Sequence, residues 1–218
     1  MSEKTQLSNF VDGAFVPPAE GGYTDVVNPS TGEVYASAPL STAADVDAAF
    51  AAADRAFQEW RRTTPGERMA YLLKMADAVE RDAEALVATE ARNTGKPIGL
   101  TSSEELPPMV DQIRFFAGAA RMLEGRATAE YMRGYSSSIR REPIGVVGSV
   151  APWNYPMMMA VWKFAPALAA ANTIVLKPSD TTPASAVHMA GVVSDGLRTI
   201  VLAAARAGAN FQTAIIIG

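Results

Sequence analysis

The segment from Ile144 to Leu176 constrains the fold most, because two apolar runs flank a helical pattern. Ile144–Val150 is a nearly continuous β-branched run, which is typical of a parallel strand covered on both faces. Pro156–Ala171 is predicted to be a helix, and Asn172–Leu176 a second buried strand. Strand, helix and strand within about thirty residues form a βαβ unit, whose handedness makes the two strands parallel. The chain is therefore predicted to contain a parallel sheet of the α/β class.

Two loops follow these strands, Ala151–Pro156 and Lys177–Thr182. In an open α/β sheet, ligands bind at the carboxyl ends of the strands, so both loops are expected at the ligand-binding edge, with the Asn154 amide and the Lys177 ammonium facing a common crevice. Gly145 and Gly148 do not complete the G-x-G-x-x-G fingerprint of dinucleotide-binding proteins, and both lie within the strand rather than after it. The usual dinucleotide signature is therefore missing from this unit.

The part of the chain before this unit combines short strands with long helices. Asn9–Val16 and Tyr23–Asn28 alternate around turn residues, which predicts a small β-meander. Apolar side chains then recur every three to four residues, the spacing of an amphipathic helix. The predicted helices run from Thr42 to just before Pro65, from Pro65 to Asn93 with Gly95 as the stop signal, and from about Pro108 to Leu123.

A β-hairpin is predicted between Gly125 and Pro143, where the period falls to two and Gly134 separates two strand-like runs of mixed polarity. A hairpin of this kind is marginally stable alone. We therefore expect it to dock against more sheet, from this chain or from a partner.

The composition of the chain argues against several classes of function. The 218 residues are 49% hydrophobic and 19% charged, enough for one sizeable core, and the net charge of −4 argues against nucleic acid or an anionic membrane surface as a partner. The chain has no cysteine, so none of its residues supplies a thiolate or a disulfide, and with no apolar signal core behind the N-terminal charges a cytoplasmic location is expected. Its apolar runs are far shorter than the ~20 residues of a membrane-spanning helix. No metal site is predicted.

Three polar residues in the two loops suggest chemistry, and each has a plainer alternative. Asn154 could donate its amide to an oxyanion, but from spacing alone it is better explained as an N-cap of the following helix. Lys177 could meet a ligand hydroxyl or phosphate, and Asp180 a ribose diol. Without further context, a strand exit followed by a capping Asp explains these two residues better.

Together, these motifs resemble the aldehyde dehydrogenase superfamily. The likeness rests on the PWN turn at Pro152, the Lys-Pro-Ser loop at Lys177, the VNPSTGE turn, the NTGKP helix stop, the FFAG helix and the hairpin before REPIG. It covers the chain from about Phe10 to about Met189, as the N-terminal portion of such an enzyme. The segments PPMVDQIRFFAGAARMLEG and PWNYPMMMAVWKFAPALAA are most similar to enzymes that oxidise aminoaldehydes such as 4-aminobutyraldehyde.

The resemblance implies roles for matching residues. Members of the family bind NAD without the usual glycine fingerprint, and NADP is an alternative. Asn154 matches the oxyanion-hole amide, Lys177 the lysine that hydrogen-bonds the adenosine ribose, and Asp180 the acid of the ribose diol. The remaining matches are Val150, Ala151, Pro152, Trp153 and Ser179 in the NAD cleft, and Tyr155, Met159 and Trp162 in the wall of the aldehyde tunnel, for which helix-core packing is the alternative.

The resemblance also implies a domain organisation and its gaps. Residues 1–125 and 144–218 would form a partial, doubly wound NAD-binding domain, and residues 126–143 an oligomerisation hairpin. The family's catalytic cysteine and general-base glutamate have no counterpart here, so the catalytic domain is absent and the chain alone is expected to be inactive. The alternative is a non-catalytic remnant that binds nucleotide weakly or associates with full-length relatives.

Three further expectations concern assembly and other residues. A homo-oligomer, or association through the hairpin and an open sheet edge, is expected, since missing strands leave an apolar edge. Lys163 and His188 are best explained by surface exposure and packing. Ala214–Ile217 is a candidate third strand.

Overall fold

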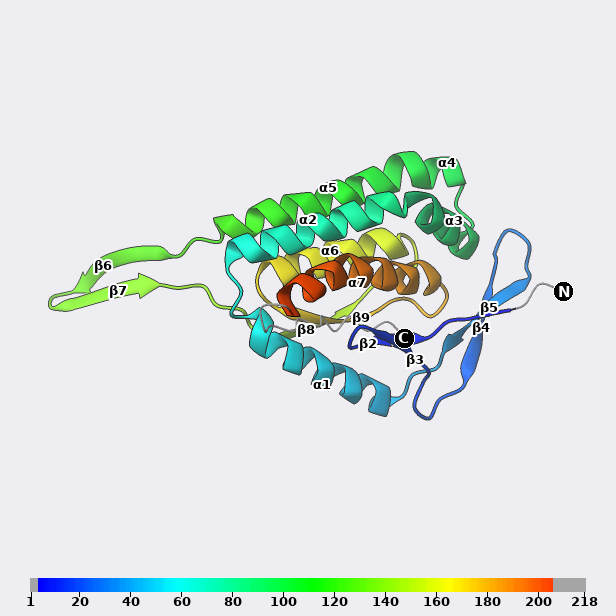
Figure 1. Cartoon of the computed structure of the whole chain (residues 1–218), viewed down its shortest axis with the longest axis horizontal. Coiled ribbons are helices and arrows are strands. Elements are labelled where there is room, and N and C mark those ends of the chain that lie inside the picture. The colour runs from blue at the N-terminus through cyan, green and yellow to red at the C-terminus, as the bar shows by residue number, and fades with distance from the viewer. Residues whose placement is uncertain (1–3, 206–218) are drawn as a thin grey trace.

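The predicted parallel pair of strands lies at the centre of an α/β fold (Figure 1). The structure is a computed structural model that describes residues 4–205. Strand β8 (Val146–Val150) and strand β9 (Thr173–Lys177) pair in register from Val146 opposite Thr173 to Val150 opposite Lys177. Helix α6 (Pro156–Ala169) joins them, which confirms the βαβ unit. Within the described residues, β8 and β9 pair only with each other.

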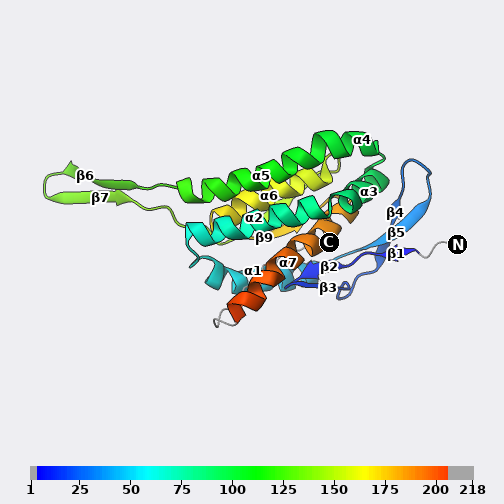
Figure 2. The ribbon, with the colours of Figure 1, turned by 45° about the horizontal axis from the view of Figure 1, so that its top comes forward.

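Helices cover the sheet in layers (Figures 1 and 2). Helix α1 (Ala43–Trp60) packs on one side of the strand pair and α6 on the other, and both contact β9 more than β8. Helices α2 and α5 lie beyond α6, and α7 (Ala184–Ala205) packs on α2, α3 and α6. The fully buried side chains between these layers include Leu72, Met75, Met109, Ile113, Met157, Leu168, Ile174 and Leu176.

The two strands differ in burial. Strand β9 is buried along its first four residues, as predicted, but β8 is not covered on both faces. Val150 is 71% exposed, and Ile144, just before the strand, is 87% exposed. The expectation for β8 was wrong in the described part of the chain, because the flanking helices centre on β9.

Reciprocal hydrogen bonds fix the starts of α1 and α2 (Pro65–Arg81). The Thr42 amide donates to Asp45 Oδ2 at 2.8 Å, and Asp45 Oδ1 also accepts from the Ala19 amide. At α2, the Thr64 amide donates to Glu67 Oε2 at 2.7 Å, and Thr64 Oγ1 accepts from the Glu67 amide at 3.3 Å. Each such cap contributes about 1 kcal/mol to holding the first turn of its helix.

The long second helix predicted from Pro65 to Asn93 is two helices. Helix α2 ends at Arg81 and α3 (Ala83–Thr94) follows, with Asp82 between them at φ −94° and ψ 15°. Asp82 Oδ2 lies 2.8 Å from His188 Nε2 on α7, a tertiary contact that periodicity does not reveal. The stop at Gly95 is confirmed, since Gly95 has φ +77° and a Cβ there would lie 2.9 Å from Pro29 Cγ.

A bent helical stretch follows α3. It consists of α4 (Ile98–Leu100), a π-helical turn η1 (Thr101–Glu105), α5 (Leu106–Ala119) and a 3₁₀ turn η2 (Ala120–Met122). The predicted third helix is confirmed, but it begins earlier than Pro108. Among the described helices, none combines the length and apolar character required to cross a membrane.

The N-terminal strands form two small sheets rather than the predicted meander. The side chain of Phe10, 2% exposed, enters the main helical core, which draws its hairpin away from the other strands. The sheets are β2 (Asn9–Val11) with β3 (Ala14–Val16), and β1 (Thr5–Gln6), β5 (Val34–Pro39) and β4 (Tyr23–Val27) in that order.

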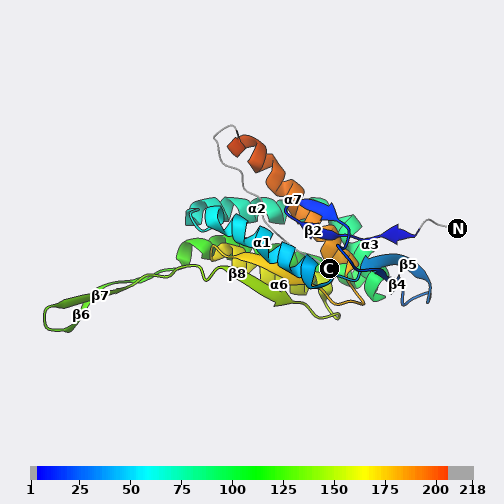
Figure 3. The same cartoon turned by 90° about the horizontal axis from the view of Figure 1, so that it is seen from below.

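The predicted hairpin is confirmed and projects from one end of the molecule, opposite the N-terminal strands (Figures 1 and 3). Strands β6 (Arg126–Met132) and β7 (Tyr135–Ile139) are antiparallel, with Gly134 at φ +82° in the turn. Every residue of β6 is exposed. The candidate third strand at Ala214–Ile217 lies outside the described residues.

Candidate functional site

The two predicted loops begin side by side. Val150 and Lys177 are register partners at the carboxyl ends of β8 and β9. The Ala151 amide donates to the Lys177 carbonyl at 2.8 Å, which extends the pairing one residue into the first loop. The backbone therefore brings both loops to one edge of the sheet, where α/β proteins bind their ligands.

A cavity of about 510 Å³ contains Asn154. The N-cap of α6 is Tyr155, so the alternative in which Asn154 caps this helix is wrong. Within residues 4–205 the Asn154 side chain has no hydrogen-bond partner, and its amide is available to a ligand. The other lining residues come from β4, the following turn, the end of α3 and the second loop: Thr24, Asp25, Val27, Pro29, Asn93, Thr94, Lys96, Trp153, Asp180, Thr181 and Thr182.

A second cavity of about 260 Å³ contains Lys177. Its walls are the carboxyl ends of the strands, including Ser149 and Val150, and the first half of α1, including Phe50. The Lys177 ammonium pairs with the Asp180 carboxylate and donates to the Pro178 carbonyl at 3.0 Å. Asn154 and Lys177 thus line neighbouring cavities rather than one crevice, and the Lys177–Asp180 pair lies between the cavities.

The other residues assigned to the cofactor cleft differ in exposure. Ala151 is buried, whereas Pro152 and Trp153 are exposed. Ser179 is partly buried, and its hydroxyl lies 3.0 Å from that of Thr181. Ala151, which is 2% exposed and whose amide is bonded to the Lys177 carbonyl, therefore offers almost no surface to a ligand, whereas the Trp153 side chain is exposed.

Tyr155, Met159 and Trp162 lie on one side of α6, as their helical spacing requires. Tyr155 is 41% and Trp162 47% exposed, so core packing is the wrong explanation for these two aromatic residues. Met159 is partly buried against the main core. These residues lie along one face of α6, the helix that begins directly after the Asn154 turn.

A buried cluster of charged side chains contacts the turn that carries Asn154, through Tyr155. The sequence analysis did not predict this cluster. Lys96 Nζ lies 2.8 Å from Glu105 Oε1 and 3.6 Å from Glu90 Oε1. The same ammonium lies 4.1 Å from the centroid of the Tyr155 ring. Burial raises the pKa of the Glu90 carboxyl, an effect that the nearby Ser185 hydroxyl and Lys96 oppose.

The second loop has a different support, Asn93 at the end of α3. Its amide nitrogen donates to the Thr181 carbonyl at 3.2 Å, and its oxygen accepts from the Ala184 amide at 2.8 Å. Asn93, not Asp180, therefore satisfies the first turn of α7. Asn93 and Lys96 both lie in the NTGKP segment. The feature of the sequence that could have pointed to them is an Asn and a Lys on either side of a helix-stopping Gly.

The two other polar residues singled out lie away from both cavities. Lys163 is partly buried in α6. His188 contacts Thr89 through Nδ1 at 3.1 Å and Asp82 through Nε2 at 2.8 Å, so it joins α7 to the α2–α3 junction. Packing accounts for His188, as expected.

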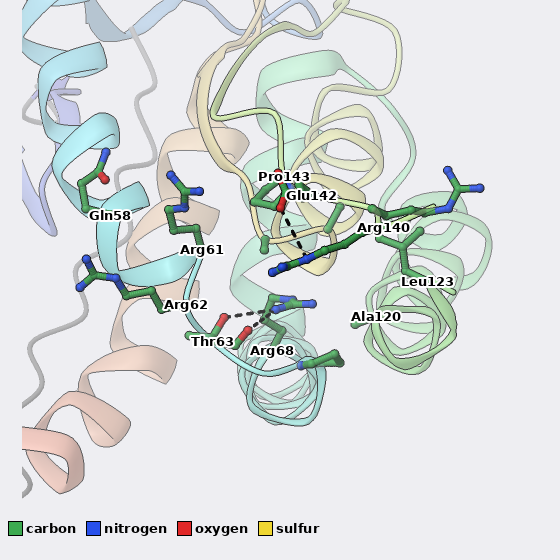
Figure 4. Close-up of a pocket in the computed structure, with 14 residues that line it drawn as sticks. Gln58, Arg61, Arg62, Thr63, Arg68, Ala120, Leu123, Arg140, Glu142 and Pro143 are labelled. Atoms are coloured by element: carbon green, nitrogen blue, oxygen red, sulfur yellow. Dashed lines mark hydrogen bonds and ion pairs between the residues drawn. The ribbon is translucent and has the colours of Figure 1, made fainter. Parts of the chain in front are cut away.

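A larger cavity of about 730 Å³ lies at the base of the hairpin and is lined by arginines (Figure 4). Arg68 donates to the Ala169 carbonyl at 2.9 Å and to the Thr63 carbonyl at 2.5 Å, and so joins the end of α6 to the turn between α1 and α2. Each other guanidinium also has a partner within the chain. These are Arg61 on the Phe57 ring, Arg62 with Glu59, Arg140 with Glu142 and Arg141 with the Glu124 carbonyl. This cavity is far from the strand ends and is distinct from the candidate site.

Comparison with known proteins gives consistent results. Residues 15–215 match the model of the aldehyde dehydrogenase family. An aldehyde dehydrogenase of Deinococcus radiodurans is 43% identical over 192 residues, which are 88% of this chain and 37% of the relative. Acetaldehyde dehydrogenase 2 of Cupriavidus necator is also 43% identical, over 88% of this chain and 38% of its own length.

Solved structures agree. An aldehyde dehydrogenase described as putative, from Burkholderia cenocepacia, superposes with a TM-score of 0.87 at 38% identity, over 98% of this chain and 41% of that one. An NAD⁺ complex of the Bacillus cereus aldehyde dehydrogenase gives a TM-score of 0.86 at 32% identity, over 97% and 41%. The chain thus spans about two fifths of the length of these relatives and belongs to the aldehyde dehydrogenase family.

Proposed function

We propose that this chain is the cofactor-binding N-terminal portion of an NAD(P)-dependent enzyme that oxidises an aldehyde to a carboxylic acid. The observation that carries the proposal is the Asn154 amide, which lines a cavity at the carboxyl edge of a parallel sheet and caps no helix. The Ala151–Lys177 hydrogen bond ties its turn to the sheet. A donor fixed in this way stabilises a developing oxyanion without reorganising.

The cofactor would be held by the second loop and the strand ends. Lys177 and Asp180 offer an exposed ammonium and carboxylate to a ribose diol, and Ser149 and Val150 form the adjoining wall. The polar donors and the apolar wall of α1 suit a nucleoside. When bound, the nicotinamide accepts the hydride. Asp180 is shorter than Glu, which leaves space for a 2′-phosphate, so NADP is tested beside NAD.

The aldehyde would lie against the apolar surface of Tyr155, Met159 and Trp162 next to Asn154. Aromatic faces attract cations, which supports an aminoaldehyde such as 4-aminobutyraldehyde as the substrate. Two of the relatives are named acetaldehyde dehydrogenases, so acetaldehyde is the comparison substrate. A higher kcat/KM for acetaldehyde would contradict the aminoaldehyde assignment while leaving aldehyde oxidation in place.

The chemistry needs a thiolate that attacks the carbonyl and a carboxylate that activates water. The chain has no cysteine, so we propose that both groups come from a further segment and that these residues alone do not turn over. The part played here is to bind the cofactor, to place the aldehyde and to hold the oxyanion donor.

The test is aldehyde-dependent NADH formation by the chain alone and after mixing with a chain that carries the downstream part of a relative. Mixing should restore turnover, and Asn154→Ala should lower kcat by about 100-fold or more. Gln58→Ala, an exposed amide at the far cavity, is the matched control and should change nothing. No turnover on mixing, together with no change of melting temperature at millimolar NAD or NADP, would contradict the proposal.

A second candidate function, association without catalysis, is favoured by the hairpin. Tyr131 and Tyr135 are 76% and 67% exposed, and within the described residues β6 pairs only with β7. An exposed hairpin and an open β8 edge both invite pairing with another chain. Sedimentation at micromolar concentration should show oligomers that Tyr131→Ser with Tyr135→Ser dissociates. A stable monomer would contradict this candidate.

A further inference from the structure

Two buried carboxylates share one ammonium beneath the candidate site. The side chains of Glu90 and Glu105 are 0% and 2% exposed, and that of Lys96 is 17% exposed. Lys96 Nζ contacts both oxygens of Glu105, at 2.8 and 3.0 Å. Glu105 ends the π-helical turn η1, and such turns often occur at functional sites. The lysine is therefore held in one place by groups from α3 and η1.

The third partner of this ammonium is the ring of Tyr155. Its centroid lies 4.1 Å from Lys96 Nζ, within the range of a cation–π interaction. Tyr155 is the N-cap of α6 and makes no side-chain capping hydrogen bond, whereas its carbonyl accepts from the Met159 amide at 2.8 Å. The ring contact and the carbonyl together fix the residue that directly follows Asn154.

We propose that Lys96 is a positioning residue, which fixes the Tyr155 ring and so orients the Asn154 amide. This inference rests on the proposed function for the role of Asn154. The ammonium does not act on the aldehyde itself. It prevents the N-cap of α6 from rotating, so that the amide donor meets the oxyanion without reorganisation.

Amide hydrogen exchange of the 218-residue chain tests the contact directly. Tyr155→Leu removes the ring but leaves the charge cluster intact, and should speed exchange of the Met159 amide about tenfold. Tyr155→Phe keeps the ring and should exchange like the original chain. The Ala151 amide, which is bonded to the sheet, and the Ala170 amide at the other end of α6 are internal controls.

Lysine variants complete a double-mutant cycle. Lys96→Met should speed Met159 exchange by a similar factor, Lys96→Arg should restore protection, and Lys96→Met with Tyr155→Leu should be no faster than either single change. Lys74→Met, an exposed lysine on α2, is the matched control. Additive effects, or unchanged exchange in Tyr155→Leu, would overturn the inference.

The mixing assay separates this inference from the proposed function. If mixing restores turnover, Lys96→Met should lower kcat more than it raises KM, and Lys96→Arg should recover most of the loss. Restored turnover with unchanged Met159 exchange would overturn the positioning role and leave the proposed function standing. Coupled exchange effects, with no turnover on mixing and no change of melting temperature at millimolar NAD or NADP, would reject the proposed function and, with it, the catalytic purpose of the contact.

Discussion

The two loops of the candidate site leave neighbouring strands at one edge, yet their supports differ. The turn with Asn154 rests on the buried ions Glu90, Lys96 and Glu105. The loop with Lys177 and Asp180 carries its ion pair on the surface, with 50% and 79% of these side chains exposed. Burial makes an ion pair costly to break, whereas water screens an exposed pair. The first loop is therefore the rigid half of the site and the second the adaptable half.

The largest expected effect is on the buried side. Lys96→Met leaves two buried carboxylates without their cation, and should lower the free energy of unfolding by about 3 to 5 kcal/mol. Chemical denaturation measures the change. Lys96→Met with Glu105→Gln removes one of these charges and should recover part of the loss. A loss below about 1 kcal/mol would show that the cluster is screened like a surface pair.

The pH dependence of the unfolding free energy is a second way to test the buried cluster against the exposed pair. Burial raises the pKa of Glu90 above its ordinary value of 4.5, so the folded chain keeps this proton at pH values where the unfolded chain has lost it. The resulting stabilisation is complete below about pH 4.5 and is lost as the pH rises through the pKa of the folded state. Glutamine does not titrate, so the Glu90→Gln variant does not lose stability in this way. As the pH rises above 4.5, the original chain should lose free energy of unfolding relative to the variant.

Glu67 is the control for the direction of this pH dependence, because its pKa is shifted the opposite way. Hydrogen bonds from Thr64 lower its pKa, so its contribution is present above the ordinary value and is lost as the pH falls through the folded pKa. Glu67→Gln should therefore differ most from the original chain at neutral pH. The same slope in both variants would contradict the assignment of Glu90.

A smaller effect is expected at Asn93, a buried anchor of the second loop. Asn93→Ala removes the acceptor of the Ala184 amide and the donor to the Thr181 carbonyl, and should cost about 1 to 2 kcal/mol of unfolding free energy. Asn93→Asp keeps the acceptor and should cost less. Equal losses in the two variants would mean that the donor to Thr181 matters more than the cap.

The sequence predicted the parts of the fold that depend on local pattern. Apolar periodicity predicted the βαβ unit, Pro65 predicted the start of α2, and the glycine at position 95 predicted the end of α3. Periodicity did not reveal the break at Asp82, because its contact with His188 is tertiary.

The same distinction applies to the candidate site. Strand order predicted that the two loops share an edge, which the register of β8 and β9 confirms. Asn154 and Lys177 nevertheless line separate cavities, since side-chain direction depends on the whole loop. Lys96 was interpreted only as part of a helix stop, because a buried ion cluster has no signature in local spacing.

The smallest effect is expected at the exposed pair. Asp180→Asn removes a surface ion pair and should change the unfolding free energy by less than about 1 kcal/mol, with a difference that shrinks further at high salt. Because the change frees the Lys177 ammonium, it should alter cofactor affinity more than stability, which a titration with NAD and NADP followed by melting temperature measures. If Asp180→Asn instead costs more than about 2 kcal/mol, far above the range of exposed pairs, the second loop is as rigid as the first and the contrast between them fails.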